Sequence, residues 1–142
     1  MGRNLCVALR RQGGFEVLEF NRRHRPAELP KLVARADLLF HLAGVNRSPE
    51  EKEFTDGNTL LTRRLCDELA TAGRPAPLVF SSSIQAELDN PYGRSKRAAE
   101  EAVLDYHRRS RAPVYIYRFP NVFGKWSRPH YKTGGATFCD HL

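Results

Sequence analysis

The feature that most constrains the fold is an alternation of short apolar runs with longer segments of helical periodicity. Residues 37–43 and 78–80 are apolar runs of strand length, and the amphipathic pattern of residues 56–72 lies between them. A strand–helix–strand order makes the two strands parallel, because the helix carries the chain back to the end where the first strand began. The sequence therefore predicts an α/β fold built on a parallel sheet covered by helices.

The remaining segments continue this alternation. Gly13 and Gly14 are a helix stop, and Asn90 followed by Pro91 offers an N-cap and a first-turn proline for a long helix. No internal repeat or low-complexity segment is present, so residues 1–142 are interpreted as one domain. We expect helices over residues 4–12, 26–34 and 91–109, a short β-type run over residues 15–20 and a strand over residues 114–119.

The composition permits a folded domain and excludes several other classes. Hydrophobic residues make up 41% and charged residues 27% of the 142 residues, which allows a packed core. No apolar run approaches the roughly 18 residues that a membrane-spanning helix needs, and the start of the chain does not read as a signal peptide. We therefore expect a cytoplasmic protein with no membrane partner.

The cysteines do not form a recognisable framework. Cys6, Cys66 and Cys139 are widely separated and make no Cys-x-x-Cys pair. This pattern argues against a disulfide scaffold and against a zinc knuckle. We interpret them as reduced thiols and assign no metal site.

The formal net charge of +7 favours an anionic partner. The arginines are scattered along the chain and are not gathered in a stripe interleaved with aromatic residues, as a single-strand nucleic-acid groove requires. A basic nucleic-acid-binding module is therefore the less favoured alternative, behind a phosphate-bearing substrate or cofactor.

Tyr92 and Lys96 stand four residues apart at the start of the predicted long helix, so they share one helix face. A tyrosine hydroxyl has a pKa of about 10, and a nearby ammonium lowers it by favouring the phenolate. The pair therefore suits general acid–base chemistry at a sugar oxygen. Ser83 ends the preceding strand and would place a hydroxyl beside the same oxygen, with Ser82 as the fallback. The spacing alone is weak evidence, since a surface tyrosine packed on a lysine stem gives the same pattern.

Four ordered segments carry a resemblance to a known family. Together they resemble the extended short-chain dehydrogenase/reductase family of nucleotide-sugar epimerases, dehydratases and reductases. The resemblance covers nearly the whole chain and implies a Rossmann-like doubly wound parallel sheet that binds NAD(P). The segments are His41-Leu42-Ala43-Gly44, Phe80-Ser81-Ser82-Ser83, Pro91-Tyr92-Gly93-Arg94-Ser95-Lys96 and Arg118-Phe119-Pro120-Asn121-Val122-Phe123-Gly124.

Within that family, residues 41–47, 81–92 and 124–129 resemble the reductase domain of capsular-polysaccharide enzymes of the CapF/WbjC type. This resemblance implies NADPH-dependent reduction of a UDP-linked 4-keto-6-deoxy-N-acetylhexosamine, for capsule or O-antigen sugars. A nucleotide-sugar 4-epimerase or dehydratase of the same family is the alternative. Family dehydratases place an acidic pair just after the serine, whereas this chain has Ile84-Gln85, which disfavours dehydration.

The resemblance also implies roles for individual residues. Ser83, Tyr92 and Lys96 are the expected catalytic residues, with Lys96 lowering the pKa of Tyr92 and holding the nicotinamide ribose. The residues expected to bind the cofactor are Gly2, Arg22, Arg23, Leu42, Ala43, Gly44, Asn58, Ser81, Ser82, Tyr92 and Lys96. Those expected to bind the UDP-sugar are Ser83, Asn121, Lys125 and Arg128, the last through the diphosphate.

Arg22 and Arg23 bear on the choice of cofactor. NAD enzymes of this fold place an acidic residue about 20 positions after the glycine motif, on the ribose 2′-hydroxyl. Here the corresponding position carries arginines, which pair with a 2′-phosphate. We therefore predict NADPH, with NAD as the alternative; a solvated turn would explain the same residues.

Both ends of the chain depart from the family pattern. Gly2 fits the last glycine of the family's Gly-x-x-Gly-x-x-Gly turn, so the first strand and two glycines are missing. The chain also stops before the family's C-terminal substrate lobe. We expect residues 1–142 to be a partial NAD(P)-binding domain, with an inactive fragment as an alternative. Family members pair through the helix bearing Tyr-x-x-x-Lys, so the resemblance implies a possible homodimer.

Three other positions receive a structural interpretation. His41 lies inside an apolar strand and is interpreted as a hydrogen-bonded core histidine, not as a ligand. Glu100 and Glu101 are expected to face solvent beside Arg97.

Overall fold

The computed structural model describes residues 1–122. Its centre is a three-stranded parallel sheet in the order β1-β2-β3. Leu39 of β1 pairs with Leu78 of β2, which in turn pairs with Val114 of β3. The parallel order confirms the predicted Rossmann-like α/β class. The strands are β1 (Leu39–His41), β2 (Leu78–Ser83) and β3 (Val114–Phe119).

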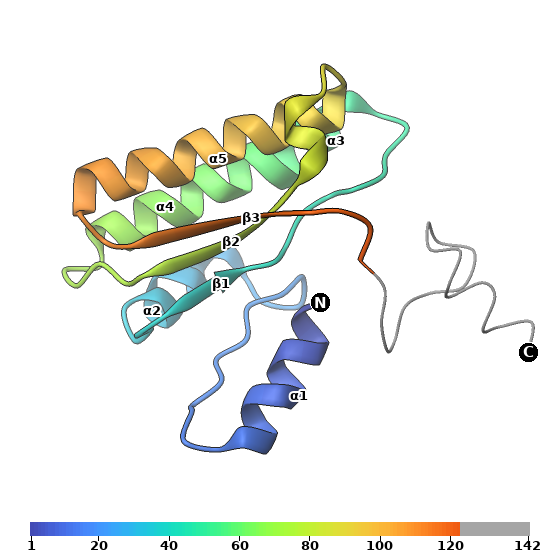
Figure 1. Cartoon of the computed structure of the whole chain (residues 1–142). Helices are drawn as coiled ribbons and strands as arrows, with labels where there is room; N and C mark the ends of the chain where they lie inside the picture. The colour runs from blue at the N-terminus through green and yellow to red at the C-terminus, as the bar shows by residue number, and fades with distance from the viewer. Residues whose placement is uncertain (123–142) are drawn as a thin grey trace, which may run out of the picture.

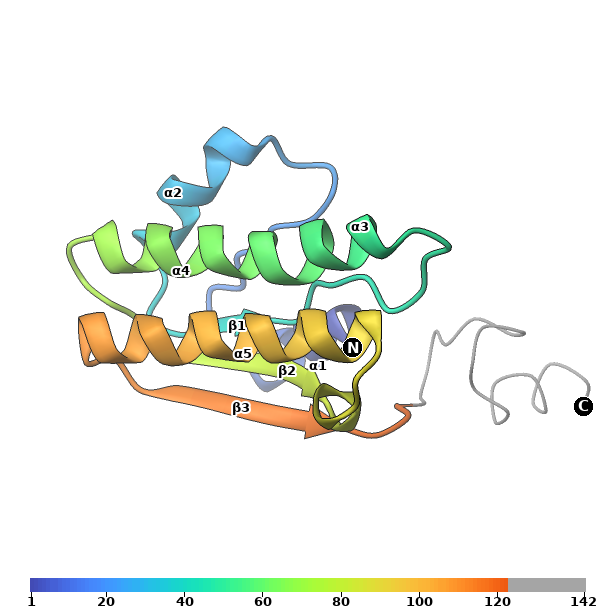
Figure 2. The ribbon, with the colours of Figure 1, turned by 90° about the horizontal axis from the view of Figure 1, so that it is seen from above.

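Helices separate the strands along the chain. In Figures 1 and 2, α4 and α5 lie side by side over one face of the sheet, and α2 lies next to α4. The first segments are α1 (Gly2–Gln12), the 3₁₀ turn η1 (Pro26–Glu28) and α2 (Leu29–Val33). The later ones are α3 (Glu51–Phe54), the π-helical η2 (Thr55–Leu60), α4 (Leu61–Thr71), the 3₁₀ turn η3 (Ile84–Glu87) and α5 (Pro91–Ser110).

The hydrophobic core lies between the sheet and the α4–α5 layer. Side chains at helical spacing on both helices meet the apolar side chains of β2. Of the amphipathic stripe in residues 56–72, Leu65 and Leu69 are buried, whereas Leu60 is 48% exposed. Each fully buried large apolar side chain contributes about 1.5–3 kcal/mol. Tyr106 adds a polar anchor, because its hydroxyl donates to the backbone oxygen of Ala76 at 2.7 Å. The largest members are Leu65, Leu69, Leu78, Phe80, Val103 and Tyr106.

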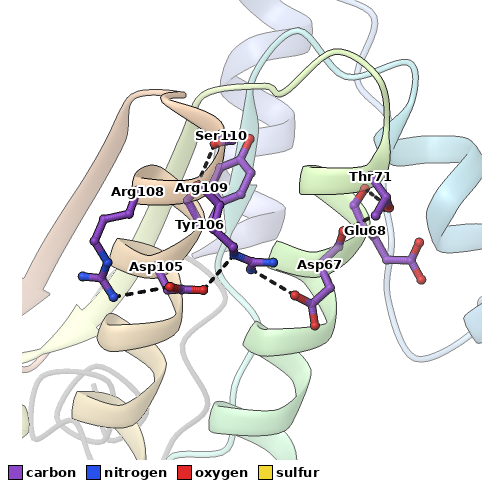
Figure 3. Close-up of polar contacts among 8 residues, drawn as sticks. All are labelled: Asp67, Glu68, Thr71, Asp105, Tyr106, Arg108, Arg109 and Ser110. Atoms are coloured by element: carbon purple, nitrogen blue, oxygen red, sulfur yellow. Dashed lines mark hydrogen bonds and ion pairs between the residues drawn. The ribbon is translucent and has the colours of Figure 1, made fainter.

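Ion pairs join α4 and α5 at the surface, at the carboxyl-terminal end of α5 (Figure 3). Arg109 contacts Asp105 of its own helix at 2.8 Å and Asp67 of α4 at 3.0 Å. Arg108 contacts the same Asp105 at 3.4 Å. Thr71 donates to the backbone oxygen of Asp67 at 3.0 Å, inside α4. All three charged pairs are solvent-exposed, so they add little to stability beside the apolar layer beneath.

The opposite face of the sheet is more open within the described residues. Phe40 is 37% exposed, and Tyr115 and Tyr117 are 50% and 52% exposed. Figure 1 places α1 on that side of the sheet, and α1 buries none of its residues. One layer of helices therefore supplies most of the packing among residues 1–122.

The predicted β-type run over residues 15–20 is wrong, since this segment forms no strand. Phe15 is 55% exposed, and within residues 1–122 no strand lies beside the segment to satisfy its backbone. Surface ion pairs hold it instead: Glu19 contacts Arg10 at 2.6 Å, and Glu16 contacts Arg35.

The other boundaries agree with the sequence to within a few residues. The predicted helix over residues 56–72 begins earlier, at Glu51, and is interrupted by the π-helical turn. Gly13 and Gly14 have φ of 75° and 77°, in the region that favours glycine, and confirm the predicted helix stop. No helix among residues 1–122 is both long and apolar enough to cross a bilayer.

Candidate active site

The first turn of α5 is fixed to η3, and this contact brings Tyr92 close to the end of β2. The Asn90 side chain accepts a hydrogen bond from the Gly93 backbone N–H at 2.7 Å, which confirms the predicted N-cap. A Cβ atom on Gly93 would stand 2.2 Å from the backbone oxygen of Gln85 and 2.6 Å from that of Leu88. Glycine therefore permits the close approach of the two segments.

Tyr92 is half-buried at this junction. Burial raises its pKa above the ordinary value of 10.0, and a hydrogen bond with Ser83 acts in the opposite direction. The ring of Phe54 meets the ring of Tyr92 edge-on, with 5.8 Å between centroids. The structure thus brings Ser83 and Tyr92 together, as the sequence predicts, and it leaves the Tyr92 hydroxyl protonated at neutral pH.

Lys96 is buried one turn further along α5, with 5% of its surface exposed. Its Nζ atom donates to the backbone oxygen of Ser81 at 2.7 Å and lies 4.4 Å from the centre of the Phe80 ring. Burial lowers the pKa of Lys96 from 10.5 to about 8, and the charge of Glu100 opposes that shift. The expectation that Lys96 lowers the pKa of Tyr92 is not met here, because burial dominates at Tyr92 and Ser83 is what opposes it.

The three consecutive serines at the end of β2 have different partners. Ser81 donates to the backbone oxygen of His41 at 3.2 Å, and Ser82 donates to the carboxylate of Glu100. The Ser83 oxygen accepts from the backbone N–H of Gln85 at 3.2 Å. Because the hydroxyl of Ser82 is committed to Glu100, Ser83 is the serine whose side chain serves Tyr92.

Glu100 is not solvent-facing, so that prediction is wrong. Its surface is 6% exposed, and its carboxylate receives two hydrogen bonds from Arg118, at 2.9 and 2.7 Å. Glu101, the next residue, is exposed as predicted.

Asn58 lies in the π-helical turn, with 2% of its surface exposed. Its carboxamide exchanges two hydrogen bonds of 2.8 Å with the backbone of Val45 and donates a third to the Ser95 hydroxyl at 2.9 Å. A Cβ atom on Gly44 would stand 2.6 Å from the Asn58 oxygen. Asn58 therefore fixes the loop after β1 against α5.

His41 is a core histidine, as predicted. Its Nε2 atom lies 2.9 Å from the Thr62 hydroxyl, and its ring stacks on Phe80 with 5.3 Å between centroids. Thr62 already donates its only hydroxyl proton to the backbone oxygen of Asn58 at 2.6 Å, so Nε2 of His41 must be the donor of their hydrogen bond. Burial, with Lys96 nearby, lowers the pKa of His41 from 6.5 to about 3.

A pocket of about 540 Å³ opens beside Tyr92. This is within the range of small-molecule sites, roughly 300–1,000 Å³. Sequence reasoning missed Ser48 and Phe54 in this wall; the signal available for Ser48 was its place directly after residues 41–47, and no local signal marked Phe54. The lining consists of Asn46, Arg47, Ser48, Pro49, Phe54, Gln85, Asn90, Pro91 and Tyr92.

The remaining predicted site residues lie apart from this cluster or outside the described chain. Gly2 begins α1, and Figures 1 and 2 place the N-terminus on the side of the sheet where β1 and β2 end. Arg22 and Arg23 lie in an exposed turn. Lys125 and Arg128 lie outside the described residues. Leu42 is partly buried, and Ala43, Gly44 and Asn121 are exposed at the ends of their strands.

The chain is similar in sequence and in fold to proteins that are already known. The chain is 51% identical, over all 142 residues, to the UDP-2-acetamido-2,6-beta-L-arabino-hexul-4-ose reductase of Pseudomonas aeruginosa, and it spans 38% of that protein. It matches the capsular polysaccharide assembling protein CapF of Staphylococcus aureus with a TM-score of 0.83 and 40% identity, over 97% of this chain and 37% of that one.

A third relative was solved with a bound nucleotide. The chain is 28% identical to the enzyme WbmF of Bordetella bronchiseptica, in complex with NAD+, with a TM-score of 0.61 over 70% of this chain and 34% of that one. The sequence profile of the NAD dependent epimerase/dehydratase family matches residues 1–138. The chain therefore belongs to the NAD dependent epimerase/dehydratase family.

Proposed function

We propose that this chain carries the catalytic core of an NADPH-dependent reductase that acts on a UDP-linked 4-keto-6-deoxy-N-acetylhexosamine. The observation that carries the proposal is the meeting of Ser83 and Tyr92 where β2 ends and α5 begins, with Tyr92 in the pocket wall and the buried ammonium of Lys96 one helical turn further along α5. The 51% identity to a reductase of a keto sugar supports the reaction class.

The residues at the strand ends fit a nicotinamide nucleotide. Ala43 and Gly44 are exposed at the end of β1 and present backbone with almost no side chain, so a sugar or phosphate can approach closely. Lys96, with a pKa of about 8, carries its positive charge at neutral pH and can hold ribose hydroxyls. When bound, the cofactor supplies the hydride that reduces the carbonyl carbon.

Tyr92 and Ser83 then donate hydrogen bonds to the carbonyl oxygen of the substrate. Because the pKa of Tyr92 is raised, its hydroxyl is protonated at neutral pH and can donate to the oxygen as negative charge develops there. Ser83 donates a second hydrogen bond to the same oxygen. The oxygen gains a proton and becomes the alcohol of the product.

Other parts of the site belong to the same proposal. Arg22 and Arg23 pair with the 2′-phosphate of NADPH; NAD would use no such pairing. Asn121, Lys125 and Arg128 bind the UDP-sugar. Gln85, placed directly in the pocket wall, supplies a neutral amide where family dehydratases carry acid, so reduction is favoured over dehydration.

The first test is thermal unfolding of the chain with NADPH, NADH or a UDP-sugar. A nucleotide that binds the folded state at a hundred times its Kd adds about 2.7 kcal/mol of stability, so the melting midpoint rises. A rise with NADPH that exceeds the rise with NADH supports the proposal. A cooperative melt that ignores both nucleotides contradicts it and identifies the chain as an inactive fragment.

The second test is reduction of the keto sugar, followed through consumption of NADPH. Tyr92→Phe is expected to lower kcat by about 10²–10⁴-fold, because it removes the proton donor and keeps the ring packed on Phe54. Tyr115→Phe is the matched control, since Tyr115 is exposed on β3. Equal activity of wild type and Tyr92→Phe would rule out Tyr92 as the acid.

A further inference from the structure

We infer that Glu100 is a positioning residue for the Ser83–Tyr92–Lys96 site. Its carboxylate ties the carboxyl ends of β2 and β3 to α5, one helical turn beyond Lys96, and its negative charge acts on the Lys96 ammonium. The effect of Glu100 on catalysis rests on the proposed function. Its contacts with Ser82 and Arg118, and its effect on the pKa of Lys96, do not depend on that function.

The carboxylate of Glu100 joins three elements. One oxygen accepts from the Ser82 hydroxyl of β2 and from Nε of Arg118 on β3, the latter at 2.9 Å. The other oxygen accepts from Nη2 of Arg118 at 2.7 Å. The two-point contact with a planar guanidinium fixes direction as well as distance. Ser82 directly precedes Ser83, so a restraint on Ser82 restrains the serine that meets Tyr92.

A fourth element completes the arrangement. The third guanidinium nitrogen of Arg118 contacts Glu87 of η3 at 2.8 Å, and η3 is the turn that packs on the start of α5. The side chain of Glu100 is 8% exposed in its pair with Arg118, whereas that of Glu87 is 72% exposed in its own. The buried contact therefore carries the restraint, and the exposed one adds little.

Lys96 interacts electrostatically with groups on two parts of the structure. On α5 the group is Glu100, and on β1 it is His41, which is neutral. On β2 its partners are the Ser81 backbone oxygen and the Phe80 ring, which carry no net charge. Arg118 of β3 and Glu87 of η3 lie beyond Glu100. Glu100 is thus the negative charge that opposes the burial of the Lys96 ammonium.

The test replaces Glu100 by Gln and measures the pKa of Lys96. Gln keeps the size of the side chain and an oxygen that accepts from Ser82, while Arg118 retains Glu87, so the variant is expected to fold. Loss of the negative charge lowers the pKa of Lys96 below its value of about 8. Looser packing alone would admit water and move it the opposite way, toward 10.5.

The pKa is read from nitrogen-15 NMR of the lysine ammonium groups in the labelled full chain, with Lys96→Met assigning the signal. Glu101→Gln is the matched control, because Glu101 is the next residue on α5 and is exposed. A fall in Glu100→Gln, with no change in Glu101→Gln, supports the inference. An unchanged or raised pKa in a folded Glu100→Gln variant overturns it.

Arg118→Gln covers the case in which Glu100→Gln does not fold. It leaves the carboxylate with Lys96 as its nearest positive charge, so the pKa of Lys96 is expected to rise. No change, or a fall, overturns the inference by this second route.

Activity supplies the catalytic readout. In Glu100→Gln, the alkaline limb of kcat/KM for keto-sugar reduction is expected to move to lower pH with the pKa of Lys96, and in Glu101→Gln it stays. A limb that stays in place while the NMR pKa falls overturns the catalytic part of the inference. If wild type binds no NADPH and reduces no sugar, the proposed function fails, and the NMR result still decides the role of Glu100.

Discussion

Gly44 lies so close to Asn58 that a Cβ atom on it would stand 2.6 Å from the Asn58 Oδ1 atom. That carboxamide cannot move freely, because it is hydrogen-bonded to Val45 and Ser95. Gly44→Ala is therefore expected to lower the free energy of unfolding by about 1–3 kcal/mol, through loss of these buried bonds. Urea unfolding measures the change. In an Asn58→Ala background the same substitution should cost much less; an equal cost in both backgrounds would contradict the clash.

Gly93→Ala is expected to be more damaging, because the added methyl group meets backbone oxygens of Gln85 and Leu88 at 2.2 and 2.6 Å. Backbone moves less readily than a side chain, so η3 must separate from α5, at a cost of about 3 kcal/mol or more. Thermal unfolding measures the loss. Gly2→Ala is the control, since a Cβ there meets nothing within 4 Å and alanine favours the helix. Similar melting points for the two variants would exclude the predicted contact.

The pKa of His41 predicts a loss of stability in mild acid. The folded-state pKa is about 3, below the ordinary 6.5, so below about pH 6.5 the unfolded chain takes up a proton that the folded chain does not. The stabilisation is complete above pH 6.5 and declines as the pH falls toward 3, by about 2 kcal/mol over the first 1.5 pH units. Urea unfolding at several pH values tests this. His41→Gln keeps a donor for Thr62 and should show a shallower decline; identical slopes would refute the assignment.

Arg109 predicts a small effect in spite of its two ion pairs. Its side chain is 45% exposed, and its partners Asp67 and Asp105 are 65% and 47% exposed (Figure 3). Arg109→Ala is expected to lower stability by about 0.5–1 kcal/mol at low salt and by less at high salt. Melting points at two ionic strengths measure both quantities. A loss of several kcal/mol in the free energy of unfolding that salt does not reduce would contradict this, because it would mean that the ion pairs are buried away from water.

Local signals in the sequence were sufficient for most of the elements. The limits of β3 and the N-cap of α5 follow from a run of β-branched and aromatic residues, interrupted by Arg118, and from Asn90-Pro91, and both agree with the structure. The run over residues 15–20 has the same local character and forms no strand, because a strand also requires a neighbour that local sequence does not specify.

In the candidate site, too, some features follow from local sequence and others depend on tertiary contacts. Tyr92 and Lys96 share a helix face by spacing alone, and Ser83 follows from its place at the end of a strand. Helical spacing places Glu100 on the buried face of α5, between Lys96 and Val103, but its partner Arg118 lies 18 residues away on β3 and no local pattern reveals that pair. The raised pKa of Tyr92 likewise comes from burial at a tertiary contact, whereas the sequence offered only the charge of Lys96.

All three candidate catalytic side chains lie within residues 83–96, one uninterrupted stretch that leaves β2 and enters α5. The short η3 turn and the glycine contact at its base set their spacing along the chain, and the Glu100–Arg118 contact then ties this stretch to β3. The relative positions of the three side chains are therefore a property of one local unit of the chain. A change in the length of a loop elsewhere is expected to leave those positions intact.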